Sequence, residues 1–441
     1  MEQASHELST RVAGHHYSLG VMCIGIEGVL DGCQSFYSSA WVIELMSYLR
    51  SEVEQVPSYA SIRLWLLRLG LYKLTRPLEQ AEDWIWIVDH TMQIGDMKCL
   101  IILGLRRSAW QAGKDRRLQR EDVEIIALEP VRESTGEVVA QQYRAAAERC
   151  GVPRAIVSDD GRDLHRGTNL YLAEHSDTCW LYDIKHRTAS LLKHALERDP
   201  EWTTYAQQAT RTKQQTFLTP EAFLVPPQQR GKARYMNVDT LVAWGQKTLA
   251  FVDDPQAAAD HNVAPQDVEK KFGWLRNYRS ALKSWQEVLN VIEVTEHYVR
   301  TEGIHQRVVR ELSPQLKALA GGPLSRRFRV QLLASLRQQA RLCREGERLP
   351  GSSEIIESVI GQYKHLQGER SPHGLTGMIL SIAANVGQRT TTLVKTAMDE
   401  ISNASLVQWC KKHLGTSVQS HRKAAFSRPT NGTKLATTLE S

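Results

Sequence analysis

The chain has 441 residues, 42% of them hydrophobic and 24% charged, and its mild net charge of +6 permits a nucleic-acid partner without requiring one. Its apolar runs fall far short of the roughly 20 residues that span a bilayer, and its first ten residues lack the pattern of a signal peptide, so we expect a globular protein of two to four domains with no membrane partner. The seven cysteines include no C-x-x-C pair, which argues against a zinc ribbon or a disulfide framework and for a reducing compartment.

Residues 1–80 are expected to form a helical domain. One segment places four apolar residues on one helical face: Trp41, Leu45, Tyr48 and Leu49. A second helix starts at Pro57 and is expected to stop at Gly70. The pair fits a helix-turn-helix with Arg63 and Arg68 facing DNA, and it fits equally well a helical hairpin that only caps the next domain.

Residues 81–200 change to strand character. Apolar runs predict five strands, at 84–88, 98–105, 123–128, 154–161 and 179–184. A helix follows each of the last three, and Ser134 with Glu137 predicts a capping box at the start of the first of these helices. Short links between the first three strands favour an antiparallel meander. The order βββαβαβα is that of the ribonuclease H-like fold, so we expect an α/β core of this type.

The rest of the chain is expected to be helical. Residues 201–350 lose all strand character and predict a large all-helical insertion with Pro- and Gly-bearing connectors. Residues 351–415 predict helices that complete the catalytic core. Residues 416–441 are poor in apolar side chains and rich in Ser, Thr, Lys and Arg, which predicts a disordered basic tail.

Two acids end strands that would be neighbours in such a sheet. Asp89 follows the apolar run of the first strand, and Asp159 ends the fourth in "IVSDDG", with Asp160 as the alternative. Close carboxylates repel each other unless a cation lies between them. Mg²⁺, with Mn²⁺ able to substitute, suits such oxygen ligands, and a pair of ions could activate a nucleophile and stabilise a leaving oxygen.

A third acid is expected on a late helix, in "GSSEIIESVIGQYKHL". Glu354 and Glu357 are three residues apart and can share a face. Lys364 lies two turns beyond Glu357 on nearly the same face, where it could meet DNA phosphate, so Glu357 is preferred as the ligand. Glu354 would then be a first-turn acid that favours the helix N-terminus.

These pieces resemble the DDE transposases whose ribonuclease H-like core carries a large insertion, namely the bacterial cut-and-paste families and the hAT-like elements. The matching segments are "IVDH", "IVSDDG", "IESVIGQYK" and "DIKH", within about residues 84–370. In "DIKH", Asp183 and His186 match the family's D-x-x-H, either beside the metal ligands or simply capping the next helix. The family's Tyr and Arg ahead of the third acid have no counterparts, since Pro350 and Ser353 stand there.

The resemblance implies an oligomeric transposase that cuts and joins DNA at the ends of a mobile element, with Asp89, Asp159 and Glu357 as metal ligands. It would act in the bacterial cytoplasm, associated with the nucleoid, or in a eukaryotic nucleus. The residues expected to contact DNA are Lys364, Arg63, Arg68, Arg230, Lys232 and Arg234. The alternatives are another ribonuclease H-like nuclease, such as a resolvase, and a non-catalytic DNA-binding protein derived from a transposase.

Overall fold

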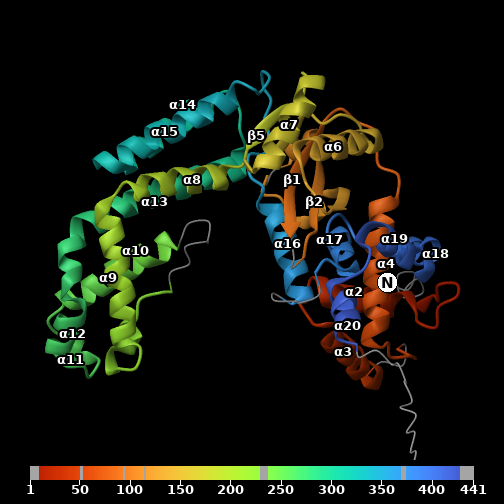
Figure 1. Ribbon diagram of the computed structural model, residues 1–441, viewed down its shortest axis with the longest axis horizontal. Coiled ribbons are helices and arrows are strands. Elements are labelled where there is room, and N and C mark those ends of the chain that lie inside the picture. The colour runs from red at the N-terminus through yellow and green to blue at the C-terminus, as the bar shows by residue number, and fades with distance from the viewer. Residues whose placement is uncertain are drawn as a thin grey trace, which may run out of the picture.

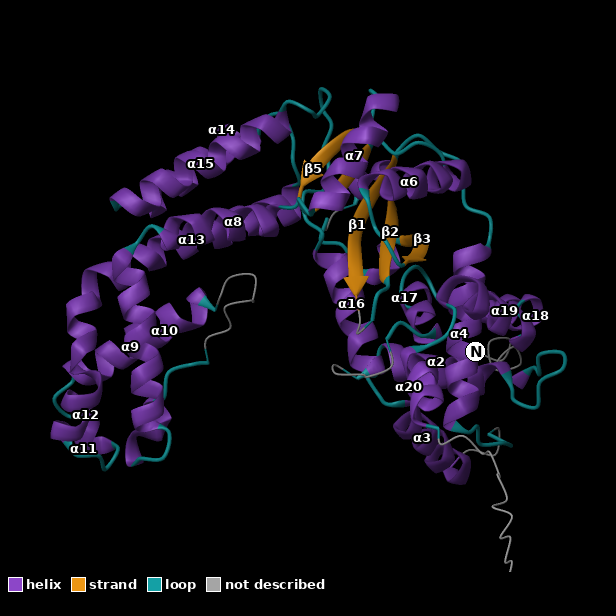
Figure 2. Ribbon diagram, viewed as in Figure 1, coloured by secondary structure: helices purple, strands orange, loops and turns teal. Residues whose placement is uncertain are grey.

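The computed structural model describes residues 9–49, 53–92, 95–113, 116–228, 237–368 and 374–427. A five-stranded mixed sheet in the order β3-β2-β1-β4-β5 lies at its centre (Figures 1 and 2). Its strands are β1 (Trp84–Met92), β2 (Lys98–Arg106), β3 (Glu124–Val131), β4 (Ala155–Ser158) and β5 (Cys179–Tyr182). Strands β1, β2 and β3 pair antiparallel, whereas β4 pairs parallel with both β1 and β5. The five expected strands are therefore present in the expected chain order.

Alternate residues of β1 enter two different cores, as the two-residue period of a strand requires. Trp86 and Val88 pack with α6 (Gly136–Cys150) and α7 (Arg162–Glu174) on one face of the sheet. Ile85 and Ile87 belong to the core on the other face.

That second face is covered by helices from distant parts of the chain. They are α4 (Tyr59–Thr75), α16 (Glu354–Gln367) and α17 (Leu380–Ala384), each of which packs against a strand. The sheet therefore lies between two helical layers. The layer on this second face is completed by α16 and α17, which follow the insertion in the chain.

The cap of α6 differs from the expected one. Thr135, not Ser134, is the N-cap residue, and its hydroxyl accepts a hydrogen bond from the backbone of Val138. The Ser134 hydroxyl instead donates to the carboxylate of Asp163, at 2.7 Å. The predicted capping box at Ser134 is wrong because a tertiary partner takes its hydroxyl.

Helix α4 forms the centre of a helical bundle with α2 (Leu19–Leu30), α3 (Phe36–Leu49) and α18 (Thr391–Glu400). It runs through Gly70, so the expected stop there is wrong. A Cβ at Gly70 would lie 2.1 Å from the backbone oxygen of Leu380, which shows that glycine is required by the close approach of α17.

The apolar face expected on the helix before α4 is present but does not enter a core. On α3, Trp41 is 59% exposed and Tyr48 is 75% exposed, and Leu45 and Leu49 are exposed as well. Tyr37 of the same helix stacks on Tyr59 at the start of α4, with ring centroids 4.1 Å apart. The prediction of a helix with these four apolar residues on one face is confirmed, but that face is exposed to solvent.

Residues 184–340 form no strand in their described part, as expected for an insertion, and extend away from the sheet as an arm (Figure 1). Its described α-helices are α8 (Ile184–Glu197), α9 (Pro200–Thr216), α10 (Val238–Asp253), α11 (Ala257–Asp260), α12 (Pro265–Phe272), α13 (Arg279–Glu302), α14 (Val308–Leu319) and α15 (Pro323–Ala340). An antiparallel bridge between Ile304 and Leu349 joins the ends of the α14–α15 excursion.

The chain ends with α19 (Asn403–Leu414) and α20 (Val418–Phe426). Helix α20 lies within the segment expected to be a disordered tail, so that prediction is wrong for residues 418–426; residues 428–441 lie outside the described part. Within the described ranges, no helix combines the length and the apolar character that crossing a membrane requires.

Candidate active site

The two strand-end acids occupy matching positions on neighbouring strands. In the parallel pair β1–β4, Ile87 lies opposite Val157. Continuing this register by two residues sets Asp89 beside Asp159, which directly follows β4. Because adjacent strands are about 4.8 Å apart, the backbones of the two acids are neighbours.

Both acids are half-buried and make local hydrogen bonds. Asp89 Oδ1 accepts from the backbone N–H of His90 at 2.7 Å, and Asp159 Oδ1 accepts from that of Gly161 at 3.1 Å. These bonds fix one oxygen of each carboxylate. Asp160, the alternative ligand, is exposed and pairs with His165.

Helix α16, which bears Glu357, packs against β1, the strand that bears Asp89. Its residues Ile356, Val359 and Ile360 are buried in the core that also holds Ile87. Glu357 lies on the flank of this apolar face and is half-buried.

Lys364 follows Glu357 by seven residues, so the two side chains leave α16 within about 20° of each other. Lys364 is exposed and lies in the last turn of the helix. The acid and the lysine expected on one flank of this helix therefore do share it.

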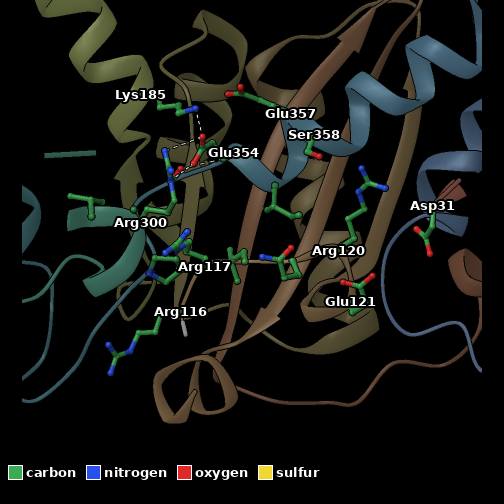
Figure 3. A pocket seen from close by; sticks show the side chains of 17 residues that line it. Asp31, Arg116, Arg117, Arg120, Glu121, Lys185, Arg300, Glu354, Glu357 and Ser358 are labelled. Atoms are coloured by element: carbon green, nitrogen blue, oxygen red, sulfur yellow. Dashed lines mark hydrogen bonds and ion pairs between the residues drawn. The ribbon is translucent and has the colours of Figure 1, made fainter. Parts of the chain in front are cut away.

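Glu354 is engaged elsewhere. Its carboxylate forms ion pairs with Lys185 of α8 and Arg300 of α13 (Figure 3). It therefore links the first turn of α16 to the arm.

Asp183 fixes the position of this first turn. It is buried and is the N-cap of α8, where Oδ1 accepts from the backbone N–H of His186 at 2.8 Å. Its Oδ2 accepts from the backbone N–H of Ser353, the residue before α16. Ile184 N–H donates to Gly351 O at 2.9 Å beside it. In this structure Asp183 and the His186 backbone have the capping role that we had considered for them.

The three expected ligands therefore lie on β1, directly after β4, and on the helix that packs against β1. Among the residues that the structure describes, no three His, Cys, Asp or Glu side chains are arranged so that they could hold a metal ion. Asp89 and Asp159 are neighbours by register, whereas Glu357 approaches from the covering helix.

A cavity of about 650 Å³ borders Glu357 (Figure 3). Five cationic side chains line it: Arg116, Arg117, Arg120, Lys185 and Arg300. Lys185 and Arg300 share Glu354, and Arg116 pairs with Glu302 at 3.4 Å. Arg117 is exposed, so its guanidinium can reach a ligand that enters the cavity.

A second polar cluster lies where β1 meets α7 and was missed from the sequence. Asp163 of α7 accepts from Ser134 and pairs with Lys98 at 3.2 Å, and its Oδ2 lies 3.8 Å from His90 Nδ1. Burial alone would raise the pKa of Asp163, but the Ser134 hydrogen bond and the charges of His90 and Lys98 hold it at about 2. Burial also lowers the pKa of His90, against the raising effect of Asp163. Asp163 gave no sequence signal, because it lies in a helix and follows no strand.

The expected DNA contacts have mixed outcomes. Arg63 is exposed on α4. Arg68 is buried, and its guanidinium bonds the backbone oxygen of Met398 and lies 3.1 Å from His15 Nε2, so the expectation that it faces DNA is wrong. Its side chain joins α4 to α18 instead. The expected contacts Arg230, Lys232 and Arg234 lie outside the described residues.

Comparison with known proteins gives a distant similarity to solved structures alone. No protein-family model matches the chain, and no curated protein matches it. Among solved structures, the strand transfer complex of the Drosophila P element transposase is similar, with a TM-score of 0.38 and 10% sequence identity over 92% of this chain and 99% of that one.

Proposed function

We propose that this protein is a DDE-type transposase, which cuts DNA at the ends of a mobile element and joins them to target DNA. The observation that carries the proposal is the register of β1 and β4, which sets Asp89 beside Asp159 under the helix that bears Glu357. Acids on two neighbouring parallel strands and on a covering helix suit phosphodiester chemistry, which needs carboxylates held rigidly around a metal.

The strand pattern supports a ribonuclease H-like core for this enzyme. Three antiparallel strands, β1 to β3, are followed by β4 and β5, which extend the sheet from the free edge of β1. The helical arm enters after β5 and the chain returns at α16, which matches a core interrupted before its third acid.

The donor chemistry fits magnesium, which prefers hard oxygen ligands and takes one or two protein carboxylates together with waters and substrate phosphates. Asp89, Asp159 and Glu357 would hold it. When bound, such ions polarise the scissile phosphate and lower the pKa of the attacking water. Substrate phosphate would complete the ligand set.

The chain's own cations would orient the DNA. Arg117 at the cavity and Lys364 on the Glu357 flank are exposed and can each meet a backbone phosphate near the acids. We further propose that the enzyme works as a homo-oligomer, because two element ends must be held together for joining.

The test compares Asp89→Asn, Asp159→Asn and Glu357→Gln with the wild type on DNA fragments that carry the sequences flanking the reading frame. We expect each variant to lose Mg²⁺-dependent cleavage and to keep DNA binding. Wild-type cleavage in any one variant would remove that acid from the site. Binding without cleavage by the wild type would favour a non-catalytic DNA-binding protein.

Two matched variants serve as controls. Glu354→Gln removes the carboxylate one turn before Glu357 on α16, and Asp160→Asn removes the one next to Asp159. Because Glu354 is held by Lys185 and Arg300, we expect its loss to cost about 1 kcal/mol of stability and to leave measurable cleavage.

A further inference from the structure

The arm contains a long stretch that is cationic and free of acids. Between Leu312 and Arg344 the sequence has one lysine, six arginines and no Asp or Glu. Most of this stretch is α15, an 18-residue helix. Helix α15 lies in the arm, away from the sheet that carries Asp89 (Figure 1).

Helix α15 uses one face for packing and leaves the other in solvent. Phe328, Leu332 and Leu336 are buried against the rest of the arm, where α15 contacts α8, α13 and α14. Arg326 and Arg337 are exposed, as is Arg341 at the helix end.

These three arginines form a row, which we call the α15 arginine row (Arg326, Arg337 and Arg341). At 100° per residue, Arg337 and Arg341 leave the helix about 20° and about 60° from the direction of Arg326. At 1.5 Å per residue, the row is about 22 Å long.

The charges of the row have no acidic partner among the residues that the structure describes. None of the three forms an ion pair with a carboxylate in the described part of the chain. Arg344, three residues beyond the row, differs, since it pairs with Asp177 at 3.1 Å. A rigid row of guanidinium groups with no acid on its own helix is complementary to a polyanion.

We propose that the α15 arginine row binds the phosphate backbone of duplex DNA outside the carboxylate site. Its length matches about six base pairs, and guanidinium groups bind phosphate oxygens in a bidentate manner. Backbone contacts of this kind fix the position of the duplex without reading its sequence. The choice of DNA as the polyanion rests on the proposed function.

The test measures the affinity of the full chain for a fluorescein-labelled 20-base-pair duplex of arbitrary sequence, by anisotropy, over a series of salt concentrations. The variant is Arg326→Gln, Arg337→Gln and Arg341→Gln combined. The control removes the same charge from three exposed cations on other helices: Arg211→Gln, Lys247→Gln and Lys270→Gln combined. Thermal unfolding checks that both proteins remain folded.

If the row contacts three phosphates, its loss makes the negative slope of log K against log salt shallower by about 2.7, and at low salt it weakens binding by one to two orders of magnitude. The control should change both quantities much less. Equal DNA binding by the two triple variants would overturn the proposal. Labelled poly-glutamate serves as a second polyanion, and a row variant that loses binding to it but binds DNA as the wild type does would also overturn the proposal. The row variant alone could lose DNA binding while even the wild type fails to cleave DNA. That result would contradict the proposed function but support DNA binding by the α15 arginine row.

Discussion

Arg154 and Glu347 form a buried bidentate ion pair, with Nε–Oε1 and Nη2–Oε2 distances of 2.9 and 2.7 Å. Arg154 precedes β4, and Glu347 lies where the arm returns to the sheet. Arg154 also donates to the backbone oxygens of Asp177 and Leu342, at 3.1 and 2.8 Å. One guanidinium therefore fastens the end of the arm to the strand that leads to Asp159.

Glu347→Gln should lower the free energy of unfolding by about 3 kcal/mol, because it leaves a buried guanidinium without its counter-charge. The matched control is Glu174→Gln, which breaks the bidentate pair of Glu174 with Arg144 on the exposed surface. There we expect a loss below about 1 kcal/mol. Urea denaturation measures both, and equal losses would show that burial does not determine the strength of the Arg154 pair.

Asp183→Ala should lower both stability and cleavage. It removes the acceptor for two backbone N–H groups, at a cost of about 2 kcal/mol, and it releases Ser353 and with it the start of α16. Urea denaturation and a DNA cleavage assay measure the two effects.

A matched control for Asp183 lies in the arm. Asp199 caps α9 and also accepts from a distant group, the indole N–H of Trp285 at 2.8 Å. Asp199→Ala should lose similar stability but keep cleavage. If both variants lost cleavage equally, Asp183 would have no special role in placing Glu357.

Gly70→Ala should destabilise the protein by about 1–3 kcal/mol, since its Cβ would meet the backbone oxygen of Leu380 and force α4 and α17 apart. Gly361→Ala is the control, because that glycine lies inside α16 and a Cβ there meets nothing within 4 Å. It should stabilise the protein by up to about 1 kcal/mol through helix propensity. Thermal unfolding compares the two, and stabilisation by both substitutions would contradict the close approach at Gly70.

Lys73 should make stability depend on pH above neutrality. Burial lowers its pKa from 10.5 to about 7, although its Nζ bonds the backbone oxygens of Val386 and Gly387, at 2.5 and 3.3 Å. Between these two values the unfolded chain holds one proton more than the folded one. The free energy of unfolding therefore rises with pH in this window, by up to about 1.4 kcal/mol per unit.

The measurement for Lys73 is urea denaturation of the wild type and of Lys73→Met between pH 6 and pH 9. The difference in stability between the two proteins should grow in favour of the wild type as the pH rises above about 7. A constant difference would show that Lys73 keeps its proton throughout this range.

The sequence predicted the sheet well because strand runs such as "WIWIV" are buried on both faces and need no knowledge of their partners. The positions of Asp89 and Asp159 followed from the strand ends. Helix faces were harder to interpret, because periodicity shows that a face exists but not what covers it. Trp41 and Tyr48 share a face that stays in solvent, whereas Arg68 and Lys73 point into the bundle.

Contacts between distant segments could not be predicted from local patterns. Gly70 was interpreted as a helix stop because nothing near it in the sequence shows why glycine is needed there. The segment that approaches it, at Leu380, is more than three hundred residues away. Ser134 was interpreted as a helix cap because no pattern in the sequence indicates that Asp163 accepts a hydrogen bond from its hydroxyl. The roles of Asp183 and Glu354 became clear only once the arm and α16 were placed beside each other.

The hydrogen bond between Ile184 and Gly351 places the exit and the return of the arm side by side. From the viewpoint of chain entropy, the arm is a loop whose ends already meet. The cost of closing such a loop grows only with the logarithm of its length, by about 0.6 kcal/mol for each doubling. Arms of very different size can therefore be carried by the same sheet, and helices can be gained or lost at the far end of the arm with little effect on how the core closes.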